Sequence, residues 1–128
     1  VEVRKRYFWF GSLKIAVACR ALPESLDGSL EGKGDDSVNK DDIIDVSNLE
    51  ESIDSVGWDV WEGATDILCR FLATWPNIVK NRYVIELGAG VGVVSAVAAC
   101  LGAEHVCCTD YDSVVLEIAS LNAKINSI

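Results

Sequence analysis

The C-terminal part of the chain alternates between short runs of β-forming residues and longer apolar stretches with helical spacing. Tyr83–Leu87 is the first β-like run, and the helical stretch Val93–Leu101 follows it. The same order then repeats, with a second β-like run at Val106–Thr109 and a second amphipathic stretch at Val114–Ile125. Strand, helix, strand and helix in short succession predict a parallel sheet with right-handed crossovers, so the predicted fold class is α/β.

One more helix is predicted before the first strand. Asp59 is followed three positions later by Glu62, which is the spacing of a capping box at a helix start. Pro76 lacks the backbone N–H that a continuing helix needs, so it ends the helix. The apolar residues before it recur at helical spacing and share one face; they are Trp61, Ala64, Leu68, Phe71 and Trp75.

The first 56 residues divide into two parts of different character. In residues 1–23, the runs Tyr7–Phe10 and Leu13–Val17 are separated by a Gly-Ser pair, which predicts an N-terminal β-hairpin. Residues 24–56 hold three glycines, many Ser and Asp and no aromatic residue, so they bury too little apolar surface to offset the entropy of ordering them. We therefore predict a disordered acidic insert there, either a solvated linker or an acidic docking loop, and a globular remainder over 57–128.

The net charge of −9 is concentrated in that insert, which carries eleven acidic and two basic residues. The rest of the chain carries nine acidic and nine basic residues without a basic stripe, which argues against a nucleic-acid partner. No stretch approaches the roughly 20 apolar residues of a membrane span, and the first apolar run is too short for a signal peptide. We therefore expect no membrane partner and a location in the cytoplasm or nucleus. The absence of Met, even at position 1, favours a fragment of a longer protein.

The cysteines do not form a pattern typical of metal binding. The chain has five of them, none in a C-x-x-C pair, and an odd count with this spacing favours reduced thiols over zinc ligands. Four lie within apolar runs, where a free thiol behaves as a small hydrophobic group. The single histidine, His105, precedes a strand and has no plausible catalytic partner in the sequence. We therefore predict no metal site.

The segment Val84–Gly92 carries the strongest chemical signal in the chain. A β-forming run ends in a turn with glycine at positions 88, 90 and 92, and a helical stretch follows at once. Glycine allows positive φ and lets a ligand approach bare backbone, while the helix start presents unpaired N–H groups. Asp110 lies twenty residues after Gly90 at the end of the second strand, where an acidic residue can bind ribose hydroxyls. The two features predict a nucleoside-cofactor site; the alternative is a tight turn in an unrelated α/β protein.

The spacing of this turn separates two cofactor classes. In the dinucleotide pattern G-x-G-x-x-G the last glycine would fall on Val93, whereas the chain shows E-x-G-x-G-x-G starting at Glu86. This spacing resembles motif I of the class I, seven-β-strand methyltransferases, which bind S-adenosylmethionine. The span 56–128 is similar to their branch of small protein-lysine methyltransferases, methyltransferase-like family 16. The matching segments are residues 57–64, Val84–Gly92, Gly102-Ala103, Thr109-Asp110, Leu121-Asn122 and Asn126. The acidic insert departs from the family.

The resemblance implies a Rossmann-like parallel sheet, incomplete here, of which this chain holds the first two βα units after the hairpin. It also implies that Glu86, Gly88 and Gly90 line the methionine end of the cofactor. The full set of implied S-adenosylmethionine-binding residues is Trp61, Glu86, Gly88, Ala89, Gly90, Gly92, Asp110 and Tyr111.

Three residues outside the glycine turn complete this implied site. Asp110 would accept hydrogen bonds from both ribose hydroxyls, because a carboxylate at a strand's carboxyl end needs partners to offset its desolvation. Tyr111 would lie beside the adenine, or would simply be a turn residue. Trp61 would close one side of the pocket, or would pack in the core.

The resemblance further implies methylation of a protein lysine in a chaperone, an ATPase or a translation factor. The catalytic residues are not identified, because the groups that receive the lysine in this family follow the fourth strand and would lie beyond Ile128. The alternative is a non-catalytic remnant or interaction module that keeps only the cofactor half-site. A dinucleotide oxidoreductase is disfavoured by Val93. We expect the fragment alone to be marginally stable and inactive, because two parallel strands bury little surface and leave an apolar edge bare.

Overall fold

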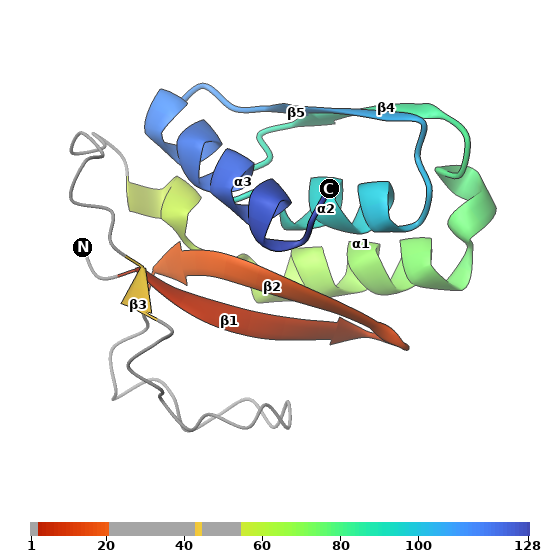
Figure 1. Cartoon of the computed structure of the whole chain (residues 1–128), viewed down its shortest axis with the longest axis horizontal. Coiled ribbons are helices and arrows are strands. Elements are labelled where there is room, and N and C mark those ends of the chain that lie inside the picture. The colour runs from red at the N-terminus through yellow and green to blue at the C-terminus, as the bar shows by residue number, and fades with distance from the viewer. Residues whose placement is uncertain (1–2, 21–42, 45–54) are drawn as a thin grey trace.

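The computed structural model describes residues 3–20, 43–44 and 55–128 (Figure 1). A layer of helices lies between two small sheets, the N-terminal hairpin on one side and a parallel pair of strands on the other (Figure 1). The strands are β1 (Val3–Phe10), β2 (Leu13–Arg20), β3 (Ile43–Ile44), β4 (Tyr83–Leu87) and β5 (His105–Thr109). The helices are α1 (Glu62–Thr74), α2 (Val93–Cys100) and α3 (Ser113–Ile125), with short 3-10 helices η3 (Ser55–Trp58) and η4 (Pro76–Ile78) before and after α1.

The N-terminal hairpin is confirmed and forms the lower layer of the molecule in Figure 1. β1 and β2 pair antiparallel without interruption from Val3 opposite Arg20 to Phe10 opposite Leu13. The two-residue turn between them contains Gly11 at a φ of +66°, a conformation that favours glycine. Ile15 and Val17 of β2 are fully buried, and β2 packs against α2 and α3, so the hairpin belongs to the core of the described fold.

The predicted strand, helix and strand unit is confirmed as well. β4 and β5 pair in parallel from Tyr83 opposite His105 to Leu87 opposite Thr109, and α2 connects them. The predicted boundaries of these elements and of α3 agree with the structure to within one residue. The even-numbered side chains of β4 turn toward α2, whereas Tyr83, Ile85 and Leu87 are 76%, 64% and 79% exposed. In the described part of the chain, helices therefore cover only one face of this parallel pair.

The predicted capping box at the start of α1 is wrong. The helix begins at Glu62, and the residue that precedes it, Trp61, makes no side-chain hydrogen bond to the helix backbone. Asp59 lies between η3 and α1, two residues before the N-cap position that Trp61 occupies, so it does not cap this helix. Its carboxylate instead lies 3.5 Å from the guanidinium of Arg20 on β2.

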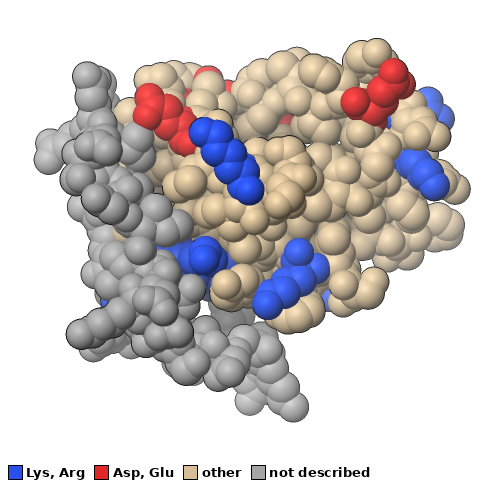
Figure 2. Space-filling view, viewed as in Figure 1, with Lys and Arg blue, Asp and Glu red and all other residues tan. Residues whose placement is uncertain are grey.

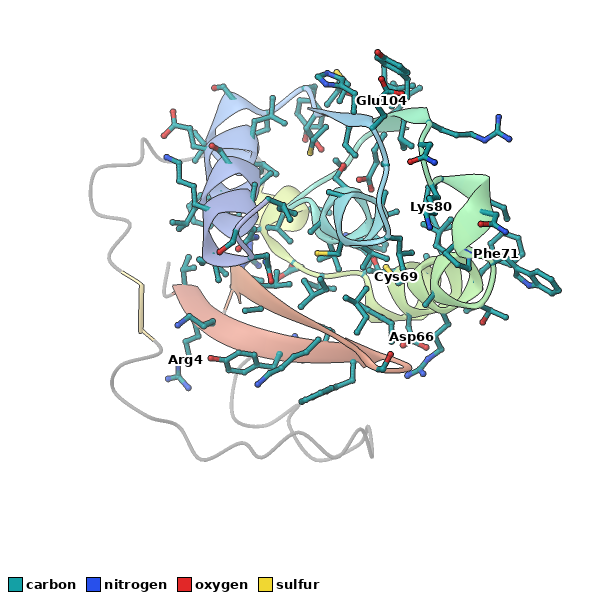
Figure 3. The ribbon with its side chains drawn as sticks, turned by 45° about the vertical axis from the view of Figure 1, so that its right-hand side comes forward. Arg4, Asp66, Cys69, Phe71, Lys80 and Glu104 are labelled. Carbon is teal, nitrogen blue, oxygen red and sulfur yellow. The ribbon has the colours of Figure 1, made fainter. Side chains whose placement is uncertain are left out.

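On the face drawn in Figure 2, most of the described surface is uncharged, and the described lysine, arginine and acidic side chains lie in small groups on it. The apolar stripe predicted on α1 is not the buried face of that helix. Its members Trp61, Phe71 and Trp75 are 66%, 48% and 60% exposed, while Cys69 and Leu72 between them are buried. Figure 3 shows Phe71 projecting outward from α1 and Cys69 on the inner side.

Only two pieces of the predicted insert over residues 24–56 are described. One is β3, which pairs antiparallel with β1 opposite Val3 and Arg4, and the other is the start of η3. The rest of the segment lies outside the described residues, so its disorder stays a prediction. No helix within the described ranges combines the length and the apolar character that crossing a membrane requires.

Candidate cofactor site

The loop that joins β4 to α2 takes the positive φ angles that its glycines predict. Gly88, Gly90 and Gly92 have φ values of +65°, +55° and +79°, a region that other residues rarely adopt. Two backbone hydrogen bonds also hold the loop, one to the neighbouring strand and one within the loop itself. The backbone N–H of Ala89 donates to the carbonyl of Thr109 on β5 at 2.9 Å, and the N–H of Gly92 donates to the carbonyl of Ala89 at 3.0 Å. The loop is therefore a closed turn held against the end of the neighbouring strand.

The three glycines differ in the space around them. A Cβ atom added to Gly92 would lie 3.0 Å from the Cβ of Ala119, and one added to Gly90 would lie 3.2 Å from the carbonyl of Gly57. A Cβ added to Gly88 would meet nothing within 4 Å. The later glycines thus serve close packing, whereas Gly88 leaves bare backbone open to a ligand.

Asp110 joins the glycine loop to the end of β5. Its Oδ2 accepts a hydrogen bond from the N–H of Gly90 at 2.9 Å, and its Oδ1 accepts one from the N–H of Asp112 at 3.2 Å. An ionised carboxylate offers about four lone-pair positions, so roughly two remain after these bonds. The residue that the sequence assigned to a ribose is therefore held in place by backbone donors and keeps acceptor capacity for two hydroxyl groups.

The carboxylate of Glu86 is hydrogen-bonded to the first turn of α2. Its Oε2 accepts hydrogen bonds from both the backbone N–H and the hydroxyl of Ser95, at 2.8 and 2.6 Å. Ser95 is the third residue of α2, and the residue before that helix, Gly92, has no side chain to cap it, so Glu86 satisfies a donor that the helix start leaves unpaired. Burial raises the pKa of the Glu86 carboxyl, and the two bonds from Ser95 offset part of that rise. Burial also raises the pKa of the Cys69 thiol to about 12, with further contributions from the charges of Glu86 and Asp66.

Three side chains that hold the site were given no role by sequence reasoning, although two of them, Thr109 and Asn122, lie in segments that match the family; the third is Ser95. The hydroxyl of Thr109 donates to the carbonyl of Glu86 at 2.6 Å, which fixes the ends of β4 and β5 together. The side-chain amide of Asn122 donates to the carbonyl of Val91 within the loop at 2.8 Å. One signal was present for Asn122, because it is polar at a helical position whose neighbours on the same face are apolar.

The structure brings six of the eight predicted residues together around this loop: Glu86, Gly88, Ala89, Gly90, Gly92 and Asp110. The other two, Trp61 and Tyr111, are 66% and 82% exposed, so Trp61 does not pack in the core of the described chain. Their contact with a cofactor stays a prediction.

Two apolar hollows lie beside α1. The larger, about 670 Å³, is at the C-terminal end of the helix between Phe71, Trp75 and Ile78, away from the glycine loop. The smaller, about 300 Å³, runs between α1 and β4 and borders Glu86 and Ser95. Within residues 3–20, 43–44 and 55–128, no group of three or more histidine, cysteine or acidic side chains is placed to hold a metal ion. The polar groups suited to a small ligand are therefore those of the loop and Asp110.

This arrangement of loop and acidic residue lies in the part of the chain that is similar to a known protein family. The family model for ribosomal protein L11 methyltransferase (PrmA) matches residues 64–128, which is about half of the chain. Ribosomal protein L11 methyltransferase from Anoxybacillus flavithermus is 38% identical over 64 residues, covering 50% of this chain and 20% of that protein.

Eukaryotic relatives are also similar to part of the chain. Protein N-lysine methyltransferase METTL21A from Xenopus tropicalis is 43% identical over 67 residues, covering 52% of this chain and 30% of that protein. Human methyltransferase-like protein 22 is 32% identical over 87 residues, covering 67% of this chain and 21% of that protein. A crystal structure named for an RNA methyltransferase from Pyrococcus horikoshii aligns with a TM-score of 0.48 and 25% identity, over 62% of this chain and 40% of that one. The aligned residues span 20–30% of the three curated relatives described here.

Proposed function

The chain belongs to the class I methyltransferases, in the family described by the ribosomal protein L11 methyltransferase model, and on that premise we propose that it binds S-adenosylmethionine and forms the cofactor half of a protein-lysine N-methyltransferase. Two kinds of relative support the lysine as acceptor, namely those named as N-lysine methyltransferase METTL21A and as electron transfer flavoprotein beta subunit lysine methyltransferase. The observation that carries the proposal is Asp110, bound to Gly90 and still able to accept from two hydroxyls.

The proposed residues act by holding the cofactor. Asp110 accepts hydrogen bonds from the two ribose hydroxyls, and the open backbone at Gly88 receives the methionine end, with Gly90 and Glu86 beside it. The exposed ring of Tyr111 is available to stack on the adenine.

The cofactor would supply a methyl group on a sulfonium: the nitrogen of a neutral lysine amine would bond to the methyl carbon as the carbon–sulfur bond breaks, so that S-adenosylhomocysteine leaves as a neutral thioether and the positive charge passes to the nitrogen. The protein's part is then mainly to position the two groups and to exclude water, and the exposed indole of Trp61 is suited to the second task. The acceptor is proposed to be a protein of the chaperone, ATPase or translation-factor class, and the location is proposed to be the cytoplasm or nucleus. The groups that receive the lysine are not assigned to any residue of this chain.

The test is a calorimetric titration of the chain with S-adenosylhomocysteine, using Asp110→Asn and Asp112→Asn as a matched pair. Each variant removes one negative charge at the same loop. Asp112 caps α3 through a bond from the N–H of Val114 at 2.9 Å, and asparagine caps a helix equally well, so this variant serves as the control. We expect Asp110→Asn to lower the affinity roughly tenfold or more and Asp112→Asn to leave it nearly unchanged.

Three results would contradict the proposal. Absence of binding by a folded chain would favour a non-catalytic remnant that keeps the motif only by ancestry. Tight binding of NADH in place of S-adenosylhomocysteine would favour an oxidoreductase. Equal losses in the two variants would mean that Asp110 does not contact the ligand.

A further inference from the structure

Two asparagines, one in α3 and one at its C-cap, bind the backbone of β2 as a neighbouring strand would. The side-chain amide of Asn126 accepts from the N–H of Ala16 at 2.9 Å and donates to its carbonyl at 2.7 Å. The amide of Asn122 accepts from the N–H of Ala18 at 2.6 Å and donates to its carbonyl at 3.1 Å. Each asparagine thus satisfies both backbone groups of one residue on β2.

The spacing of these pairs explains why side chains of a helix can bind along the free edge of a strand. Four residues of an α-helix rise about 6 Å, and two residues of a strand advance about 6.7 Å. Asn122 in α3 and Asn126 at its C-cap are four residues apart, and their partners Ala18 and Ala16 are two residues apart on β2. The amides therefore match the repeat of the backbone groups along the strand, and they pair the edge of β2 that faces away from β1.

Asn122 makes an additional hydrogen bond to the glycine loop, and Asn126 does not. A side-chain amide carries two N–H donors, and the second donor of Asn122 binds the carbonyl of Val91 in the glycine loop at 2.8 Å. The second donor of Asn126 returns to its own helix, to the carbonyl of Asn122 at 2.8 Å. Asn122 is therefore the member of the pair that joins the hairpin to the loop.

The hydrogen bond between Asn122 and Val91 is buried, so losing it would be costly in free energy. Asn122, Val91 and Ala18 are 1%, 2% and 0% exposed. The N–H of Ser95, which a helix extended by one residue would direct to the Val91 carbonyl, is bound to Glu86 instead. Loss of the Asn122 donor would leave a buried carbonyl unpaired, which costs more than an ordinary hydrogen bond contributes.

We infer that Asn122 is a positioning residue for the glycine loop, and that it ties the shape of this loop to the docking of the β1–β2 hairpin. The consequence for cofactor affinity rests on the function proposed above. The hairpin is then part of the cofactor site without containing a residue that touches the cofactor.

Hydrogen exchange of backbone amides tests the inference without any ligand. Asn122→Asp and Asn126→Asp are matched variants, since each keeps the acceptor oxygen, loses both donors and adds one negative charge. The readout is the exchange rate of the loop amides of Gly90 and Gly92, relative to that of Leu101, whose N–H donates to Val97 at the end of α2. We expect Asn122→Asp to raise this ratio roughly tenfold or more and Asn126→Asp to leave it within about threefold.

Asn122→Ala is the second variant, because it removes the donors without burying a charge, and it decides the test where Asn122→Asp does not fold. Equal ratios in the Asn122 and Asn126 variants, or a loop that exchanges as in the unmodified chain, would overturn the inference. The affinity for S-adenosylhomocysteine should fall in parallel with the loop ratio, and equal affinities in the two variants would overturn the cofactor part. Failure of the unmodified chain to bind S-adenosylhomocysteine would count against the proposed function alone, since the exchange rates decide the role of Asn122 independently.

Discussion

The carboxyl group of Glu86 is a partly buried acid that stabilises the fold in one protonation state more than in the other. Burial raises its pKa above the ordinary value of 4.5, and the bonds from Ser95 reverse only part of the rise. Because the pKa is higher in the folded than in the unfolded chain, the contribution of Glu86 is fully present below pH 4.5. It is lost as the pH rises through the folded pKa, since the unfolded chain then releases its proton more easily.

Replacing Glu86 by glutamine should therefore stabilise the chain near neutral pH. Glutamine keeps an oxygen that can accept from Ser95 but cannot ionise, so we expect the free energy of unfolding to rise by on the order of 1 kcal/mol at about pH 7. The gain should shrink to near zero at about pH 4. Urea unfolding of both chains at the two pH values measures it, with Glu104→Gln as a control because Glu104 is an exposed glutamate. A gain of the same size at both pH values would contradict the explanation by ionisation.

Sequence alone could identify the residues of the site whose requirements are local. Gly88, Gly90 and Gly92 are needed for positive φ within one turn, and Asp110 is marked by its place at a strand end. Thr109 and Asn122 act instead on backbone carbonyls that lie 23 and 31 positions away in the chain. Such pairs are set by how the elements pack, and no spacing rule within one segment predicts them.

At the scale of elements, α1 differs from the other two α-helices in that no side chain is seen to bind the backbone at its start. Asp112 caps α3 and Glu86 binds the first turn of α2, but the residue before α1 is Trp61, whose side chain makes no cap. An indole at this position gives up the hydrogen bond that serine would make to the helix backbone. The exposed indole of Trp61 is in keeping with the binding role proposed for it.

Trp61→Ser should separate these two roles. Serine is a favourable N-cap, so we expect the free energy of unfolding to increase by roughly 0.5–1 kcal/mol. The affinity for S-adenosylhomocysteine should fall at the same time, because the variant loses the ring proposed to close the pocket. Trp75→Ser is the control, since it removes an indole of similar exposure at the other end of α1 without adding a cap. The explanation would be wrong if stability did not rise, or if both variants bound the ligand equally well.

The direction in which α1 faces could not be predicted from its sequence. Periodicity shows which residues share a face, but α1 carries apolar residues on two sides, with Cys69 and Leu72 on one and Phe71 and Trp75 on the other. The hairpin and α2 cover the first side within the described fold. A helix with two apolar faces gives no signal of which face is buried, and within the described residues only the face with Cys69 and Leu72 is covered.

At the scale of the whole molecule, the parallel pair is covered on one side only. Parallel sheets are normally buried on both faces, and here β4 exposes Ile85 and Leu87 and has no strand beside its second edge within the described residues. Leu68, one member of the exposed stripe of α1, lines the smaller hollow together with residues of the same strand. The incomplete sheet with a bare apolar edge that the sequence predicted is what the described part of the chain shows. Apolar surfaces of this kind mark interaction sites or promote association.

The chain is therefore expected to self-associate through this surface, and matched isoleucine variants can show whether it does. Ile67 on α1 and Ile85 on β4 are 72% and 64% exposed, while Ile128 at the C-terminal end is 45% exposed. Each change to lysine adds the same charge to a chain of net charge −9, so differences between the variants report position and not charge. Burying an isoleucine contributes about 1.5–3 kcal/mol, so Ile67→Lys and Ile85→Lys should each weaken association roughly tenfold or more, and Ile128→Lys much less. Sedimentation velocity over a range of concentrations measures this change in association.

Equal effects of all three variants would place the contact elsewhere. An unmodified chain that stays monomeric at every concentration would show that the exposed apolar residues of β4 and α1 do not drive association.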